Sequence, residues 1–192
     1  ISRERYWATP LPVWKQAEMQ NEKRKTKSSD DFIVIGSIDE LKKYTKKSGN
    51  KYFVMRHAEA ENNTLGVISS KADNPHHLTE KGKEQMPDAI KKLKKNKIDV
   101  IVSSPFVRTQ ETAEIVADGL GIDKNNIVID KRIQELQAGE IEGVSVEEYH
   151  KHFDSFEECF EKGCPGGENY MQIKNRMGDF IYDIEDKYKD KN

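Results

Sequence analysis

The chain has 192 residues, of which 34% are charged and 35% hydrophobic, so its length suits one domain of ordinary size plus an appendage. Its 32 basic and 34 acidic residues nearly balance, which gives no overall case for a nucleic-acid-binding protein. No apolar stretch has membrane-spanning length, and the polar amino end lacks the apolar region of a signal peptide, so we expect a cytoplasmic protein with two free thiols, Cys159 and Cys164.

The first 51 residues contain little that could form a core. Pro10 and Pro12 exclude a continuous helix over residues 1–14. Residues 15–31 are charged and could form a solvated helix or a flexible connector; we favour the connector, because they offer almost nothing apolar to bury. The elements predicted next are a strand at Phe32–Ile35, a capping box at Ser37–Glu40 that starts a short helix over residues 41–44, and a linker over residues 46–51.

From residue 51 onward, predicted strands and helices alternate, which is typical of a mostly parallel sheet with helices on both faces. Thr79 is the expected N-cap of the first helix, and Pro87 is expected to kink that helix or split it in two. The predicted strands cover residues 51–55, 99–103 and 127–129, and the predicted helices cover residues 79–94, 106–120, 146–161 and 169–189.

The first of these strands ends on Arg56-His57, within the run Met-Arg-His-Ala-Glu-Ala-Glu. Open α/β sheets bind ligands at the carboxyl edge of their strands. The planar fork of donors of an arginine suits phosphate oxygens, and a histidine nitrogen can carry a phosphoryl group. The pair therefore predicts phosphoryl transfer through a phosphohistidine.

Two later motifs bring further groups to the same edge. Arg108 follows the second strand at the start of a helix, whose amino-terminal dipole favours an anion. Glu135 follows the third strand, where a carboxyl group could serve as general acid for a leaving alcohol or as base for water. Glu140 and Glu142 compete for this role, and only spacing favours Glu135.

Three motifs occur in a characteristic order: Arg-His-Ala-Glu, Leu-Thr-x-x-Gly-x-x-Gln from Leu78, and Ser-Ser-Pro-x-x-Arg-x-x-x-Thr-Ala from Ser103. Over residues 52–192 they resemble the histidine phosphatase superfamily, the phosphoglycerate mutase-like group. The resemblance implies a three-layer α/β/α fold and hydrolysis of a small phosphomonoester without metal or cofactor. It implies that His57 is the nucleophile, that Arg56 and Arg108 hold the phosphoryl group, that Glu135 donates the proton, and that Asn63 and Glu59 contact the substrate.

One feature departs from that family's pattern. The family places a second catalytic histidine on a strand after the last helix, whereas no histidine follows His152 here. We therefore expect a domain that is incomplete at its C-terminal end and inactive or poorly active as it stands. The strand edge left without its neighbour is expected to favour aggregation.

The amino-terminal segment resembles a different family. Residues 1–14, Ile-Ser-Arg-Glu-Arg-Tyr-Trp-Ala-Thr-Pro-Leu-Pro-Val-Trp, and residues 34–41 are similar to isoleucyl-tRNA synthetase of class I, although Ala8 replaces the usual glycine. This resemblance implies a parent chain that uses ATP and tRNA, with ATP bound mainly outside the present sequence. The predicted division is a synthetase-like segment at 1–45, a linker at 46–51 and a truncated phosphatase-like domain at 52–192. The first two form an N-terminal extension of the third.

Two functional hypotheses follow from these resemblances. In the first, the inserted domain is a phosphatase; in the second, it is an inactive structural or binding module, and the only function is that of the parent isoleucine-tRNA ligase. The joint presence of His57, Arg56, Arg108 and Glu135 favours the first. Hydrolysis is favoured over mutase activity because no long insertion that would clamp a phosphosugar is evident. Surface positions are expected for the histidines at 76, 77, 150 and 152 and for the basic run at 91–95.

Overall fold

The structure, a computed structural model, describes residues 13–15, 32–34 and 48–192. The chain divides into two compact units, residues 1–47 and 48–192. In the first unit, β1 (Val13–Lys15) pairs antiparallel with β2 (Phe32–Val34), which confirms the strand predicted there. Of the connector predicted over residues 15–31, Lys15 belongs to β1 and the rest lies outside the described residues, as do the capping box and the short helix at 41–44.

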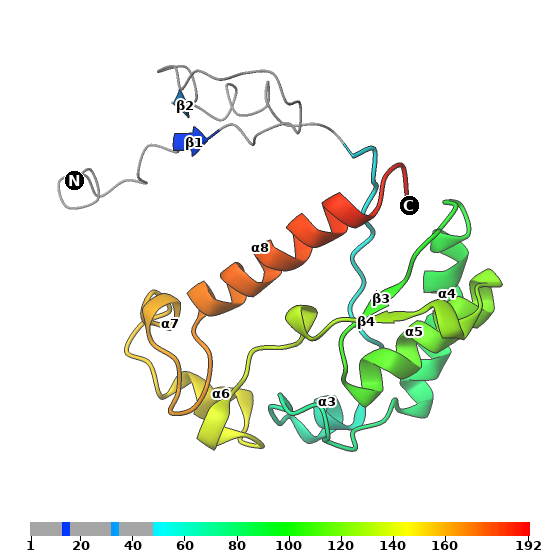
Figure 1. The fold of residues 1–192 in the computed structure, drawn as a ribbon. Coiled ribbons are helices and arrows are strands. Elements are labelled where there is room, and N and C mark those ends of the chain that lie inside the picture. The colour runs from blue at the N-terminus through cyan, green and yellow to red at the C-terminus, as the bar shows by residue number, and fades with distance from the viewer. Residues whose placement is uncertain (1–12, 16–31, 35–47) are drawn as a thin grey trace. The chain divides into compact units, whose positions relative to one another are not determined.

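The second unit contains a parallel pair of strands, β3 (Val102–Ser103) and β4 (Val128–Ile129), drawn in green at its centre (Figure 1). The pairing continues at both ends, where the Val128 amide donates to the Ile101 carbonyl at 2.9 Å and the Asp130 amide donates to the Ser103 carbonyl at 2.9 Å. Both predicted strands are confirmed, although each is shorter than expected.

Helices make up most of the rest of this unit. Thr79 caps α4 through a hydrogen bond from the Gly82 amide to its hydroxyl at 3.0 Å, as predicted, and Asn169 caps α8. The longer helices are α4 (Glu80–Leu93), α5 (Val107–Leu120) and α8 (Tyr170–Lys187), and the shorter ones are α3 (Glu61–Leu65), α6 (Val146–His150) and α7 (Glu158–Glu161). None of these helices is long and apolar enough to cross a membrane.

One helix prediction needs correction. The helix expected over residues 146–161 is two short helices, because side chains compete for the backbone between them: the Asp154 amide donates to the Glu158 carboxylate at 2.8 Å. The helix that contains Pro87 runs without a break from Glu80 to Leu93, so the predicted split does not occur, and the alternative, a kink, stays a prediction.

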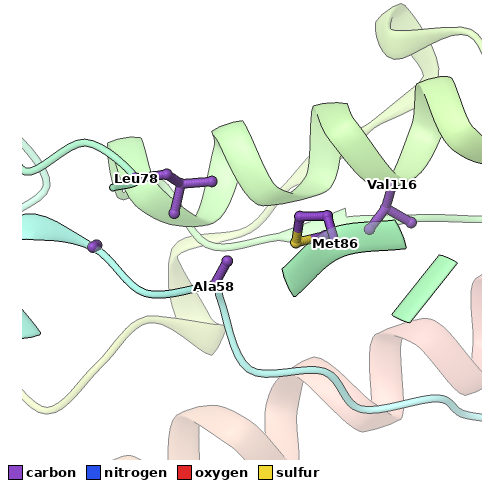
Figure 2. Close-up of a cluster of buried hydrophobic side chains, with 5 residues drawn as sticks. Ala58, Leu78, Met86 and Val116 are labelled. Carbon is purple, nitrogen blue, oxygen red and sulfur yellow. The ribbon is translucent and has the colours of Figure 1, made fainter. Parts of the chain in front are cut away.

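The core joins α4, α5 and the segment just after His57. Figure 2 shows Ala58, Leu78, Met86 and Val116, which form this buried cluster together with Ala60. The Ala58 amide donates to the Thr112 hydroxyl of α5 at 3.2 Å. Gly82 lets α4 approach this segment closely, because a Cβ atom there would lie 2.1 Å from the Glu59 carbonyl oxygen. The chain beside His57 is therefore fixed from two sides.

The strand predicted over residues 51–55 is not present. This stretch is extended but belongs to no sheet, and Val54 is 98% exposed. A strand needs a partner to form its ladder of hydrogen bonds, and within residues 48–192 no strand pairs with this stretch; the Lys51 amide instead donates to the Lys191 carbonyl at 2.8 Å. The described residues thus show a mixed α/β fold with one parallel strand pair, and the predicted three-layer sheet stays a prediction.

Candidate active site

His57 is held in one tautomer by its own backbone. Its Nδ1 lies 2.7 Å from the carbonyl oxygen of Ala58, and because a carbonyl can only accept, Nδ1 must carry the proton. Nε2 then keeps its lone pair, which accepts a hydrogen bond from Nε–H of Arg108 at 3.3 Å. This arrangement leaves Nε2 as the nucleophilic atom of the imidazole.

The surroundings of His57 also keep the ring neutral. Burial lowers the pKa of His57, and the positive charges of Arg108 and Arg56 lower it further. The hydrogen bond to the Ala58 carbonyl and the negative charge of Glu135 act in the opposite direction but do not outweigh these effects. A neutral imidazole next to two guanidinium groups is suited to attack an anionic phosphoryl group.

Arg108 is a buried cation in the first turn of α5, with only 3% of its surface exposed. Its Nη2 donates to the carbonyl oxygen of Ser69 at 2.9 Å, and its Nη1 donates to the hydroxyl of Ser69 at 3.3 Å. Its guanidinium carbon also lies 4.4 Å from the ring centre of the buried Phe106. Burial lowers the pKa of Arg108, and these contacts fix its guanidinium beside His57.

A cavity of about 520 Å³ opens on one side of His57. Four of the six predicted site residues line it, whereas Arg108 and Glu135 do not. Asn63 Oδ1 accepts the Ala60 amide at 3.0 Å and so caps α3. The lining residues are Arg56, His57, Glu59, Asn62, Asn63, Gly66, Val67, Gln85 and Val146.

The carboxylate of Glu59 is already paired within its own neighbourhood. Lys81 Nζ donates to one of its oxygens at 2.8 Å, and the Thr79 hydroxyl donates to the other at 2.9 Å. These bonds lower the pKa of Glu59 and offset its negative charge at the cavity wall. The wall is thereby less repulsive to a phosphate than its composition suggests.

Glu135 lies on an exposed loop, and its carboxylate accepts the amide of Leu136 at 2.9 Å. Arg176 of α8 holds this loop, donating to the Arg132 carbonyl at 2.6 Å and to the Glu135 carbonyl at 3.3 Å. The negative charge of Glu135 opposes the lowering of the pKa of both His57 and Arg108, so the carboxylate lies within electrostatic range of both groups.

The structure separates the three competing acids. Glu140 is exposed, and its carboxylate makes no hydrogen bond within residues 48–192. The carboxylate of Glu142 is occupied by Ser70 and Asn74. Of the three acids, only Glu135 is among the causes that shift the pKa of His57. No local motif marked Ser69, Ser70 or Asn74, because their contacts reach residues far away in the sequence.

Comparison with known proteins bears on this site. The model of the histidine phosphatase superfamily (branch 1) matches residues 52–192, which is most of the chain. The chain belongs to the histidine phosphatase superfamily. The resemblance carried by the three motifs is therefore confirmed at the level of the family.

The relatives of this histidine phosphatase domain include enzymes of two kinds by name. A probable phosphoglycerate mutase, GpmB, of Cronobacter sakazakii is 31% identical over 130 residues, 65% of this chain and 58% of that protein. Phosphoserine phosphatase 1 of Hydrogenobacter thermophilus is 31% identical over 143 residues, 72% of this chain and 65% of that protein. The chain thus spans about three fifths of the length of these relatives.

Solved structures agree on the fold. YhfR of Bacillus stearothermophilus is 30% identical, with a TM-score of 0.58 over 69% of this chain and 65% of that one. An Escherichia coli protein described as a putative alpha-ribazole-5'-P phosphatase has the same TM-score of 0.58 at 22% identity, covering 69% of this chain and 65% of that one. The mixed α/β fold is accordingly that of the histidine phosphatases.

Proposed function

We propose that the histidine phosphatase domain hydrolyses a small phosphomonoester through a phosphohistidine on His57, without a metal ion or cofactor. The observation that carries the proposal is the state of His57: its Nδ1 faces the Ala58 carbonyl and its Nε2 lone pair faces a fixed guanidinium. In the first step Nε2 attacks phosphorus, the phosphorus–oxygen ester bond breaks, and Glu135 gives a proton to the leaving alcohol.

In the second step a water molecule attacks the phosphohistidine. The phosphorus–nitrogen bond breaks, Glu135 takes a proton from the water, and inorganic phosphate leaves with Nε2 restored. Arg56 and Arg108 offset the charge on the equatorial oxygens in both steps. The Nε–H of Arg108, which lies 3.3 Å from Nε2, would turn from the nitrogen to a phosphoryl oxygen as the substrate binds.

We infer a small, polar substrate. The cavity of about 520 Å³ has six polar side chains among its nine lining residues, and the apolar side chains among them are Val67 and Val146. The relatives named phosphoserine phosphatase and probable phosphoglycerate mutase also point to small phosphorylated acids. Hydrolysis is preferred to mutase chemistry, as the sequence predicted. Asn63 and Glu59 are placed in this proposal as groups near the substrate.

The test is covalent labelling of His57. The protein is mixed with a generic phosphomonoester and quenched in base, and phosphate on His57 is sought by mass spectrometry. We expect a label that His57→Ala abolishes and that the matched control His152→Ala, at an exposed position, leaves unchanged. Because the chain without the predicted second histidine is expected to be poorly active, the same labelling is carried out on a chain extended past Asn192. A folded, extended protein without any label on His57 would disprove the proposal.

The proposal also keeps two finer predictions. In the first, the domain is part of a longer cytoplasmic chain whose residues 1–41 resemble isoleucyl-tRNA synthetase. The synthetase part of that chain would use ATP and tRNA. The family match begins at Tyr52 and so does not include that segment. If the predicted second histidine follows Asn192, a chain extended past that residue should label and turn over faster than residues 1–192.

The second hypothesis, an inactive binding module in a synthetase-like chain, predicts a different pattern. Because Arg56 and Arg108 remain in place, such a module would still bind inorganic phosphate. It would form no phosphohistidine and would turn over no substrate. In such a module, His57→Ala would change only the affinity for phosphate. Binding without label, in the extended chain as well, would favour the module over the enzyme.

A further inference from the structure

We propose that Glu142 is a positioning residue, which holds both Arg108 and the loop of Glu135 in place through the buried pair Ser69-Ser70. The inference rests on the function proposed above, since it assigns Glu142 a task in the same site. It also resolves the competition among the three acids: one is placed as the proton donor, and another supports the residues around it.

Ser69 and Ser70 form a connection between the two halves of the site. They are 3% and 1% exposed. Ser69 accepts both terminal nitrogens of Arg108, one at its carbonyl (2.9 Å) and one at its hydroxyl (3.3 Å). Ser70 turns the other way: its hydroxyl accepts the Ala138 amide at 2.9 Å, and its carbonyl accepts the side-chain amide of Gln137 at 2.7 Å.

Glu142 binds this pair from the side. Its carboxylate accepts the Ser70 amide at 2.7 Å, the Ser70 hydroxyl, the side-chain amide of Asn74 at 2.6 Å and the Lys71 amide at 3.4 Å. Asn74 donates in addition to the Ser69 hydroxyl at 3.0 Å, which is the oxygen that accepts Arg108. One carboxylate therefore organises the acceptors of Arg108 and the support of the Glu135 loop.

The backbone keeps Glu142 in reach of its partners. The Ile68 amide donates to the Val144 carbonyl at 2.8 Å, and the Gly143 amide donates to the Ile68 carbonyl at 3.1 Å. These bonds join the chain on either side of the contact, so the approach of Glu142 to Ser70 is built into the fold. Burial would raise the pKa of Glu142, but the donors from Ser70 and Asn74 outweigh it and hold the carboxylate ionised.

Removing the charge should loosen the whole arrangement. One oxygen of the Glu142 carboxylate accepts three N–H groups, and the other accepts the Ser70 hydroxyl. In Glu142→Gln the amide has one acceptor oxygen in place of two, so at least one of these donors, such as the Ser70 hydroxyl, loses its partner. A buried donor left without a partner drives the surrounding chain to rearrange. The oxygen atoms of Ser69 would then shift, and the guanidinium of Arg108 would lose its fixed orientation.

The experiment compares Glu142→Gln with Glu140→Gln in the same chain. Glu140 is its matched control, because it lies two residues earlier, is exposed, and makes no side-chain hydrogen bond within residues 48–192. Two quantities are measured: the affinity for inorganic phosphate by calorimetry, and the exchange rate of the Arg108 Nε–H by NMR, with its signal assigned by its loss in Arg108→Lys. Unfolding temperatures show that each variant is folded.

We expect Glu142→Gln to weaken phosphate binding about tenfold and to speed the exchange of the Arg108 Nε–H, because a small misplacement of a binding group is costly. Glu140→Gln should change neither quantity. If Glu142→Gln does not fold, Asn74→Ala takes its place, since it removes only the bridge to Ser69, and a weaker effect of the same sign is expected.

The outcomes separate this inference from the proposed function. Equal phosphate affinity and equal Arg108 exchange in Glu142→Gln and Glu140→Gln would overturn the positioning role, even if His57 becomes phosphorylated. Faster Arg108 exchange in Glu142→Gln, in a protein whose His57 stays unphosphorylated in the chain extended past Asn192 as well, would support the positioning role and refute the phosphatase.

Discussion

At the scale of single residues, His57 serves two requirements that usually conflict. A nucleophile must be neutral, and a phosphate site must be positively charged. The Ala58 carbonyl fixes the proton on Nδ1, while the burial of His57 and the charges of Arg108 and Arg56 disfavour a second proton on the ring. In the proposed mechanism, the cations that would attract the substrate thus also keep His57 in its neutral form.

The titration of His57 tests this account. Because its pKa in the folded protein is below the usual value of about 6.5, the neutral form persists to lower pH, and phosphorylation should fall only as pH drops through that lowered pKa. His77 is the internal reference, since its hydrogen bond to Glu111 raises its pKa. We expect the NMR titration midpoint of His57 below 6.5 and that of His77 above it; a reversed order would contradict the assignment.

At the scale of elements, the site depends on the packing of α4 against α5. The chain that carries His57 is not part of a sheet, so its position comes from the buried cluster behind it. Ala58 lies in that cluster with Met86 of α4 and Val116 of α5 (Figure 2). Damage to this packing should therefore reach the active site as well as the stability of the fold.

Truncation of Met86 measures this dependence. Met86 is 1% exposed, so Met86→Ala should lower the free energy of unfolding by about 2–5 kcal/mol through lost burial and a cavity. Met171→Ala, in α8 at a position 41% exposed, is the control and should stay within about 0.5 kcal/mol. Urea unfolding followed by circular dichroism provides both values, and equal losses in the two variants would show that the cluster does not hold the fold together.

At the scale of the whole molecule, carboxylates tie distant segments together. Glu111 of α5 binds His77 and the Leu78 amide, and Glu168 binds Arg176 and the Gln137 amide. Together with Glu142 on Ser70, these acids link the loops around the site to α5 and α8. Burial alone would raise the pKa of each of the three carboxyls, yet the donors facing them leave every pKa lowered.

A loss of stability in acid follows. A carboxyl whose pKa is lower in the folded than in the unfolded state stabilises the fold above its unfolded pKa, and this contribution disappears as pH falls through the folded pKa. The urea midpoint should therefore fall as pH is lowered below about 4.5, the usual value for glutamate. Glu168→Gln should flatten this dependence, whereas Glu140→Gln should not. A midpoint that rises in acid would refute this account.

The comparison of sequence and structure is clearest at particular residues. Thr79 as a helix cap depends only on residues within one turn, and the structure confirms it. The strand expected at residues 51–55 was wrong because a strand depends on a neighbour that its own residues do not specify. The break between α6 and α7 was missed because the Asp154 backbone amide donates to the Glu158 carboxylate, and the periodicity of apolar residues does not show such a bond.

For this protein, the sequence by itself determined the family, because the motifs that carry the resemblance are patterns along the chain, and it named His57 and Arg108 as candidate site residues. Only the tertiary structure decided the state of His57 and the different positions of Glu135, Glu140 and Glu142. Those three acids lie within eight residues of one another and look alike in the sequence. They differ because Ser70 and Asn74, about 70 positions away, donate hydrogen bonds to Glu142. These donors come from a distant part of the chain, so the sequence around Glu142 does not reveal them.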